Sequence, residues 1–168
     1  ELRLVIVGGR DAHHVADRLA EAEVAVILER VMARPARDFE GVHSGFERAR
    51  RLHEAGVVVA ISVGSGGWFD SIARNLPFHA GMARAHGLPD DAALASVTLN
   101  PARILGVDDR MGSIEVGKRA HLIATTGDVL EIREPVARMW IDGHEVDLAD
   151  RHDRLYERYR DRPVRAEE

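Results

Sequence analysis

Short apolar segments alternate with amphipathic segments over the first part of the chain. The runs LRLVIVGG (residues 2–9), VAVILE (24–29) and VVVAIS (57–62) are almost continuously apolar, as is typical of strands buried on both faces of a sheet. Residues 11–23 and 46–56 place apolar side chains three and four positions apart, which predicts helices. The alternation of strand and helix predicts an α/β fold with a parallel sheet.

The segment 73–106 has helical periodicity throughout. Two helical stretches are expected there, ending at Gly87 and Gly106, because glycine favours the conformation that closes a helix. We expect Asp11 to cap the helix of residues 11–23 and Asn100 to cap a helical restart before Gly106. Side-chain oxygens at such positions accept hydrogen bonds from main-chain N–H groups.

The pattern changes after residue 106. Short apolar runs broken by Gly, Asp and Pro predict antiparallel strands over residues 107–148. The charged segment 149–168 has Leu155, Tyr156 and Tyr159 at helical spacing, which predicts a solvated helix with one anchoring apolar stripe. We therefore expect three parts: 1–106, 107–148 and the tail 149–168.

Composition and charge exclude several kinds of partner. The net charge is −5 and the arginines are scattered, so no nucleic acid is expected to bind. No apolar run approaches the ~20 residues of a membrane span, so no membrane contact is expected. The absence of cysteine excludes disulfides and thiolate metal ligands, and the compartment stays unknown: soluble, cytoplasmic or exported. Because the chain begins at Glu1 without a leader pattern, we expect it to be part of a longer protein.

Few catalytic side chains follow the predicted strands. Of the nine histidines only His43 lies in a loop near a strand end. The glycines at 8–9 and 64–67 offer main-chain N–H groups to an anion, but neither set matches a nucleotide-binding motif. The one catalytic candidate is Asp70, a carboxylate close enough in sequence to reach the edge after residues 57–62.

A small-molecule substrate would meet side chains on the loops that follow the strands. An arginine there could pair with a substrate carboxylate, although solvation at the surface explains each arginine as well. The candidates for this rim are Arg30, Arg34, His43, Trp68 and Arg74.

A resemblance to a known family covers nearly the whole chain except the tail. NPARILG, DDRMGSIEVGK and WIDGHEV, within residues 95–146, resemble the junction between barrel and β-sandwich in the amidohydrolase superfamily, nearest its imidazolonepropionase-like branch. Residues 2–21, 24–35 and 50–62 resemble the sixth, seventh and eighth strand units of that barrel.

The resemblance implies a fold. The chain would be the C-terminal part of a (β/α)8 TIM-type barrel, followed by strands of a small β-sandwich. Residues 1–106 would supply the last three strand–helix units and 107–148 the C-terminal portion of the composite sandwich. Three strands alone leave open sheet edges, so the N-terminal half of the barrel or an oligomeric partner is expected to complete the sheet.

The resemblance also implies a reaction. The family hydrolyses C–N bonds of amides and cyclic amides with a zinc-like divalent metal that activates water. Its sixth strand usually ends in His and its eighth in an Asp. The matching positions here are Gly8 or Gly9 and, after Ser62, Val63 and Gly64. No metal ligand is therefore assigned, and we expect this segment not to bind the metal.

Several explanations of these missing ligands remain open. The protein is a non-catalytic relative acting as a binding or partner subunit, or it keeps a reduced site to which Asp70 folds back. In a third explanation the upstream half carries all the catalytic groups. Without the family, the glycine loops would favour a phosphate-binding α/β domain.

Overall fold

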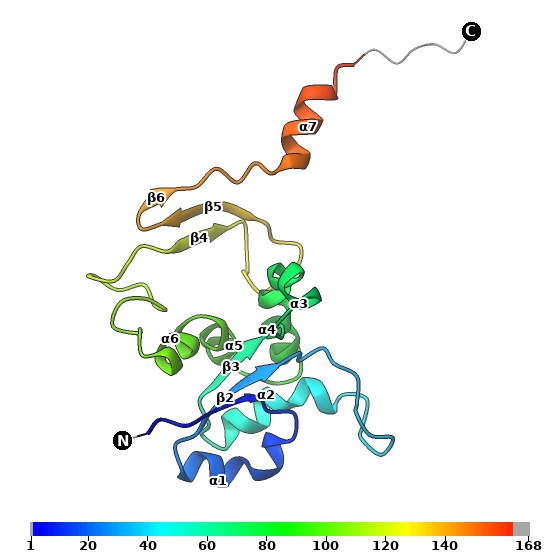
Figure 1. Ribbon diagram of the computed structural model, residues 1–168, viewed down its shortest axis with the longest axis vertical. Coiled ribbons are helices and arrows are strands. Elements are labelled where there is room, and N and C mark those ends of the chain that lie inside the picture. Colours follow the sequence, from blue (N-terminus) through cyan, green and yellow to red (C-terminus); the bar gives the residue numbers. More distant parts are fainter. Residues whose placement is uncertain (1, 163–168) are drawn as a thin grey trace.

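A parallel sheet forms the centre of the fold. The computed structural model describes residues 2–162, apart from the side chains of Trp68 and Asp70. The sheet has the order β1-β2-β3, and both strand pairs are parallel, as the hydrophobic pattern predicts. Its strands are β1 (Val5–Gly8), β2 (Ala25–Glu29) and β3 (Val59–Ser62) (Figure 1).

Helices connect the strands and cover the sheet. Because α2 contacts η1 and α4, and both α2 and α4 contact β3, these helices form a continuous layer against the sheet. No helix between residues 2 and 162 is long and apolar enough to cross a membrane. The helices are η1 (Ala12–Val15), α1 (Ala16–Glu21), α2 (Ser44–Glu54), α3 (Trp68–Ser71), η2 (Ala73–Asn75), α4 (Leu76–Ala85), α5 (Asp90–Val97) and α6 (Leu99–Leu105).

The core lies between the sheet and this helix layer. On β2, Val26 and Leu28 are fully buried, while the alternate residues Ala25 and Ile27 stay half-buried on the other face. This alternation follows from the period of two along a strand. Leu52 of α2 and several alanines of α4 and α5 complete the cluster.

A second, antiparallel sheet follows the helices, as the change of pattern at residue 107 predicts. Its hairpin turns at Asp142 and Gly143, whose φ angles of 52° and 79° suit the twist of a two-residue turn. Arg84 of α4 pairs with Asp128 and Glu131 in the segment before β5, which attaches this part to the helices. The strands are β4 (Leu122–Thr125), β5 (Val136–Ile141) and β6 (His144–Glu145).

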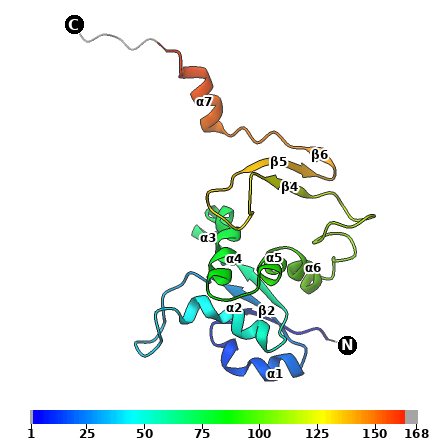
Figure 2. The same cartoon turned by 180° about the vertical axis from the view of Figure 1, so that it is seen from behind.

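The tail forms α7 (Arg151–Tyr159), which extends away from both sheets (Figure 2). Asp150 and Asp153 cap it reciprocally, each accepting from the other's main-chain N–H. Leu155, Tyr156 and Tyr159 are at least partly exposed, so the expected anchoring stripe is wrong for the residues the structure describes. Residues 163–168 at the end of the predicted tail lie outside the described residues.

Two expected helix caps are also wrong. Asp11 precedes η1 but makes no capping hydrogen bond, because its carboxylate binds Arg37 instead. Asn100 lies inside α6, which begins at Leu99, and its side chain reaches β3. Both side chains form hydrogen bonds with partners that are distant in sequence. A local sequence pattern does not reveal such pairs.

Candidate functional site: a basic cavity at the strand ends

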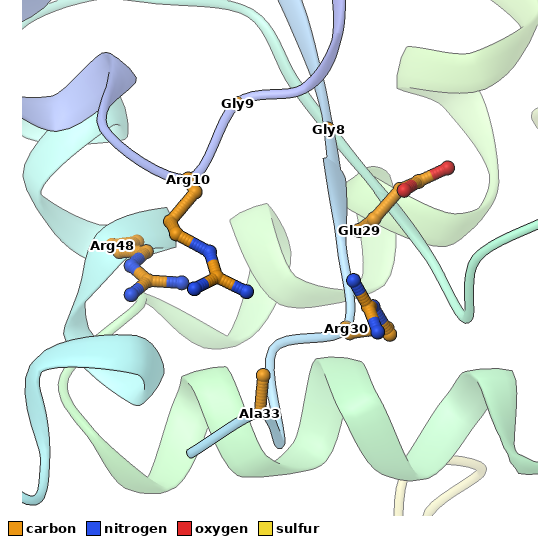
Figure 3. Close-up of a pocket in the computed structure, with 7 residues that line it drawn as sticks. All are labelled: Gly8, Gly9, Arg10, Glu29, Arg30, Ala33 and Arg48. Atoms are coloured by element: carbon orange, nitrogen blue, oxygen red, sulfur yellow. The ribbon is translucent and has the colours of Figure 1, made fainter. Parts of the chain in front are cut away.

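The carboxyl ends of the three strands lie at one edge of the sheet, since all run in the same direction. A cavity of about 230 Å³ opens there between the ends of β1 and β2 (Figure 3). This edge is where parallel α/β folds place their ligands. The cavity is lined by Gly8, Gly9, Arg10, Glu29, Arg30, Ala33 and Arg48.

The two glycines shape one wall of the cavity. Gly9 has a φ of +56°, and a Cβ there would lie 2.6 Å from Cγ1 of Val26, so only glycine lets the chain pass this close to β2. Gly8 has a φ of +96°, and no atom lies within 4 Å of the position its Cβ would take. The backbone at Gly8 therefore borders open space.

Arg48 reaches the cavity from the buried face of α2. Gly45, Ala49 and Leu52 share that face, and Arg48 is only 3% exposed. A Cβ at Gly45 would lie 2.9 Å from the carbonyl oxygen of Ala33, so α2 begins tightly against the loop after β2. Burial lowers the pKa of the Arg48 guanidinium, and the nearby charge of Arg10 acts in the same direction.

Two more arginines face this space. Arg30 follows β2 with a φ of 51°, and its N–H donates to the carbonyl of Ser62 at 3.0 Å. Its guanidinium carbon lies 5.2 Å from the centre of the Phe69 ring. Figure 3 shows the guanidinium groups of Arg10 and Arg48 beside each other, while the Glu29 carboxylate points away from them.

A network of charged groups ties together the loops after β1 and β2. Arg37 donates to both carboxylate oxygens of Asp11, at 2.9 and 2.8 Å, and to Oε1 of Glu40 at 3.0 Å. The hydrogen bond from Arg37 lowers the pKa of Asp11. The N–H of Ala36, followed by Arg37, lowers the pKa of Glu40. Both acids are therefore ionised at neutral pH.

Of the rim side chains that the structure describes, Arg30 lines the cavity, and Arg34, His43 and Arg74 are not part of its lining. Arg34 and Arg74 are exposed and absent from its lining. His43 precedes α2, with its Nδ1 3.3 Å from Nε2 of His86. Trp68 and Asp70 belong to α3, but their side chains lie outside the described part of the structure. A role in substrate binding stays a prediction for all of them.

Sequence reasoning missed Arg10, Arg48 and Glu29. Arg48 carried a signal, since it occupies an apolar position in the helical repeat of 46–56. Arg10 directly follows the glycines that end the first strand and Glu29 ends the second. A charged residue at either position does not by itself indicate a site. It does so only once the sheet brings the two strand ends together.

At the described strand ends, Glu29 of β2 carries a side chain of a kind that commonly ligates a divalent metal. Gly8, Gly9, Val63 and Gly64 have no donor side chain, and the Ser62 hydroxyl accepts from the Gly64 N–H at 3.1 Å. Among the described residues no group of three or more His, Cys, Asp or Glu side chains could hold a metal ion. The charged groups lining the cavity beside them are the guanidinium groups of Arg10, Arg30 and Arg48, which repel a cation, and the carboxylate of Glu29.

Comparison of the sequence with known proteins points to one family. The family model described as "Amidohydrolase family" matches residues 4–146. An imidazolonepropionase from Symbiobacterium thermophilum is 38% identical over 109 residues, which cover 63% of this chain and 24% of that protein. The chain spans at most 24% of the length of the curated relatives it matches.

Solved structures agree with the sequence comparison. An amidohydrolase from Thermotoga maritima superposes with a TM-score of 0.73 at 29% identity, over 86% of this chain and 37% of that one. An adenosine deaminase from Xanthomonas campestris, solved with bound zinc, superposes with a TM-score of 0.57 at 28% identity, over 84% of this chain and 36% of that one.

Proposed function

Because the chain belongs to the amidohydrolase family, we propose that it is the substrate-binding portion of a hydrolase that cleaves C–N bonds in amides or cyclic amides. The observation that carries the proposal is the basic cavity at the carboxyl edge of the parallel sheet. In barrels built from such strands the substrate binds at this edge. The chain's own residues would bind and orient the substrate there.

We propose further that residues 1–106 form the last three strand–helix units of a (β/α)8 barrel. The support is β1, an edge strand whose neighbourhood is apolar and open: Leu2 is 91% exposed, Leu4 64% and Val7 65%. Exposed apolar edges are unfavourable in water and are normally covered. Further strands of the same protein, or of a partner subunit, would pair with β1.

The second sheet supports the same kind of completion. Ile123 of β4 and Ile141 of β5, two apolar residues of the antiparallel sheet, are each about half exposed. Such a sheet normally buries one face against another layer. Residues 107–148 would therefore contribute one portion of a composite β-sandwich, with 149–168 as a charged tail.

The family typically uses a metal, and we propose that this segment does not bind it. The positions that match the sixth- and eighth-strand ligands are Gly8 or Gly9 and Val63-Gly64. Activation of water would then depend on groups outside this segment. The same observation favours a second candidate, a non-catalytic relative that binds a small molecule or serves as a partner subunit.

Assays of the protein as its gene encodes it separate the two candidates. We expect hydrolysis of a panel of linear and cyclic amides, and a metal content that Asp70→Asn leaves unchanged. Loss of the metal in Asp70→Asn would identify Asp70 as a ligand and contradict the proposed absence of a metal site. If no amide is hydrolysed even with metal added, the second candidate, a non-catalytic relative, is supported.

A further inference from the structure

Described carboxylates neutralise the charges around the cavity only in part. Within the described residues Arg10 has no ion pair, and Arg30 rests on the Phe69 ring. Arg48 has one carboxylate near it, Oε2 of Glu40, at 3.8 Å from its Nη2. By contrast, Arg37 on the adjacent loop holds three carboxylate oxygens at 2.8 to 3.0 Å. The cavity therefore concentrates positive charge.

Arg48 is the informative member of this group. Its side chain is 3% exposed, and its buried Nε has no hydrogen-bond partner among the described residues. A buried charge is unfavourable unless it is paired and hydrogen-bonded. Among the described residues, only the long contact with Glu40 offsets the desolvation of this guanidinium at the cavity wall.

Glu40 cannot fully act as the hydrogen-bonded partner of Arg48. Its Oε1 accepts from Arg37 and its Oε2 from the main-chain N–H of Ala36, at 3.0 Å each. These bonds hold the carboxylate in the rim network and leave its contact with Arg48 long. The described residues therefore leave Arg48 able to form a stronger interaction with an anion.

We propose that this cavity binds an oxyanion, a carboxylate or phosphate group of a small molecule, between the guanidinium groups of Arg10 and Arg48. Arg30 forms a further cationic wall, and the open space at Gly8 leaves room for the ligand. The inference rests on the proposed function and deepens it, because it names the part of the substrate that this edge holds. The Glu29 carboxylate points away from Arg10 and Arg48. It would repel a second negative charge of the ligand on its side of the cavity.

The test is a binding measurement on the protein as its gene encodes it. Isothermal titration with N-acetylglycine, its neutral amide N-acetylglycinamide, and inorganic phosphate is compared with sodium chloride at the same ionic strength. We expect N-acetylglycine or phosphate to bind and the neutral amide not to bind. Whichever of the two anions binds more tightly identifies the ligand as a carboxylate or a phosphate.

Variants assign the binding to the cavity. Arg10→Gln and Arg48→Met should each weaken binding about ten-fold or more, since a charge-assisted hydrogen bond is lost. The matched control is Arg51→Gln on the same helix, where the arginine pairs with Glu47 in solvent, and binding should be unchanged. Glu29→Gln should strengthen binding, because it removes a negative charge from the cavity wall.

Thermal unfolding separates a ligand-binding arginine from a structural one. Without an anion, Arg48→Met should unfold at the same temperature as the wild type or higher, because it replaces a poorly paired buried charge. If that variant does not fold, Arg10→Gln decides the question, since Arg10 is exposed.

The proposal is overturned if the wild type binds neither anion more tightly than the neutral amide, or if binding survives both Arg10→Gln and Arg48→Met. If the protein binds the anion but hydrolyses no amide, the proposed hydrolase activity is rejected and the anion site is not. The two failures are therefore distinguishable.

Discussion

The side-chain amide of Asn100 in α6 donates a hydrogen bond from Nδ2 to the main-chain carbonyl of Val59 in β3, at 2.8 Å. The carbonyls of Val58 and Ser62 accept from N–H groups of β2 and of Arg30 that follows it. Val59, one residue after Val58, therefore presents its carbonyl to the opposite edge of β3. Asn100 satisfies an acceptor that the three-stranded sheet leaves open.

Asn100→Ala should lower the free energy of unfolding by about 1–2 kcal/mol, because the carbonyl of Val59 loses its donor. Urea denaturation measures the change. Asn75→Ala is the control, since Asn75 precedes α4 without a capping hydrogen bond. Equal effects of the two substitutions would show that the contact with β3 contributes nothing.

Gly81→Ala should destabilise the protein although Gly81 lies inside α4. Alanine is favoured over glycine in a helix by about 1 kcal/mol. Here a Cβ would lie 2.5 Å from the carbonyl oxygen of Leu130, a main-chain atom that cannot simply rotate away. We expect a net loss of about 1–3 kcal/mol.

Thermal or urea unfolding checks the Gly81 prediction. Gly41→Ala is the matched control, because no atom lies within 4 Å of its Cβ position, and its unfolding should be nearly unchanged. A Gly81→Ala variant as stable as the wild type would mean that the segment around Leu130 moves freely relative to α4.

His79 should make stability depend on pH. It is buried in α4, its Nδ1 has no partner among the described residues, and burial lowers its pKa below the ordinary 6.5. As the pH falls below about 6.5, the unfolded chain binds a proton at His79 that the folded chain does not, so stability decreases. The decrease ends once the pH is below the folded pKa.

Unfolding curves at several pH values between 8 and about 5 measure this effect. His79→Leu should reduce the loss of stability on acidification, whereas His53→Gln, at an exposed position, should not. His13, whose pKa burial also lowers, accounts for part of the remaining slope. The same slope in His79→Leu and wild type would contradict the assignment.

Arg37→Gln should raise the pKa of Asp11 toward its ordinary 3.8 and that of Glu40 toward 4.5. Because both are lowered in the folded protein, their stabilisation is present above the ordinary values and is lost as the pH falls through the folded ones. NMR titration of the carboxyl carbons checks the shift. Arg34→Gln, an exposed neighbour, should leave both pKa values unchanged.

Much of the fold could be predicted from sequence because it depends on local periodicity. The apolar runs ending at Gly9, Glu29 and Ser62 form the parallel strands, and the glycine at 106 closes α6 in the left-handed conformation. The Asp142-Gly143 pair turns the predicted antiparallel hairpin. Period and turn chemistry are properties of neighbouring residues, so they can be recognised without tertiary contacts.

The family was also recognisable from sequence, since its motifs over 95–146 lie within the matched region. The candidate site was not. Of the predicted rim side chains that the structure describes, Arg30 alone lines the cavity, while Arg10, Glu29 and Arg48 were absent from the prediction. The same limitation explains Asp11 and Asn100, expected as caps and found with partners 26 and 41 residues away.

The sequence by itself determined the order of strands and helices, the change to an antiparallel part, and the membership of a family. Only the tertiary structure decided which charges meet. Arg48 faces the ends of β1 and β2 because α2 packs its apolar face, Arg48 included, against the sheet. An arginine in that face becomes part of a cavity only when packing brings three distant segments together, and no local pattern encodes that meeting.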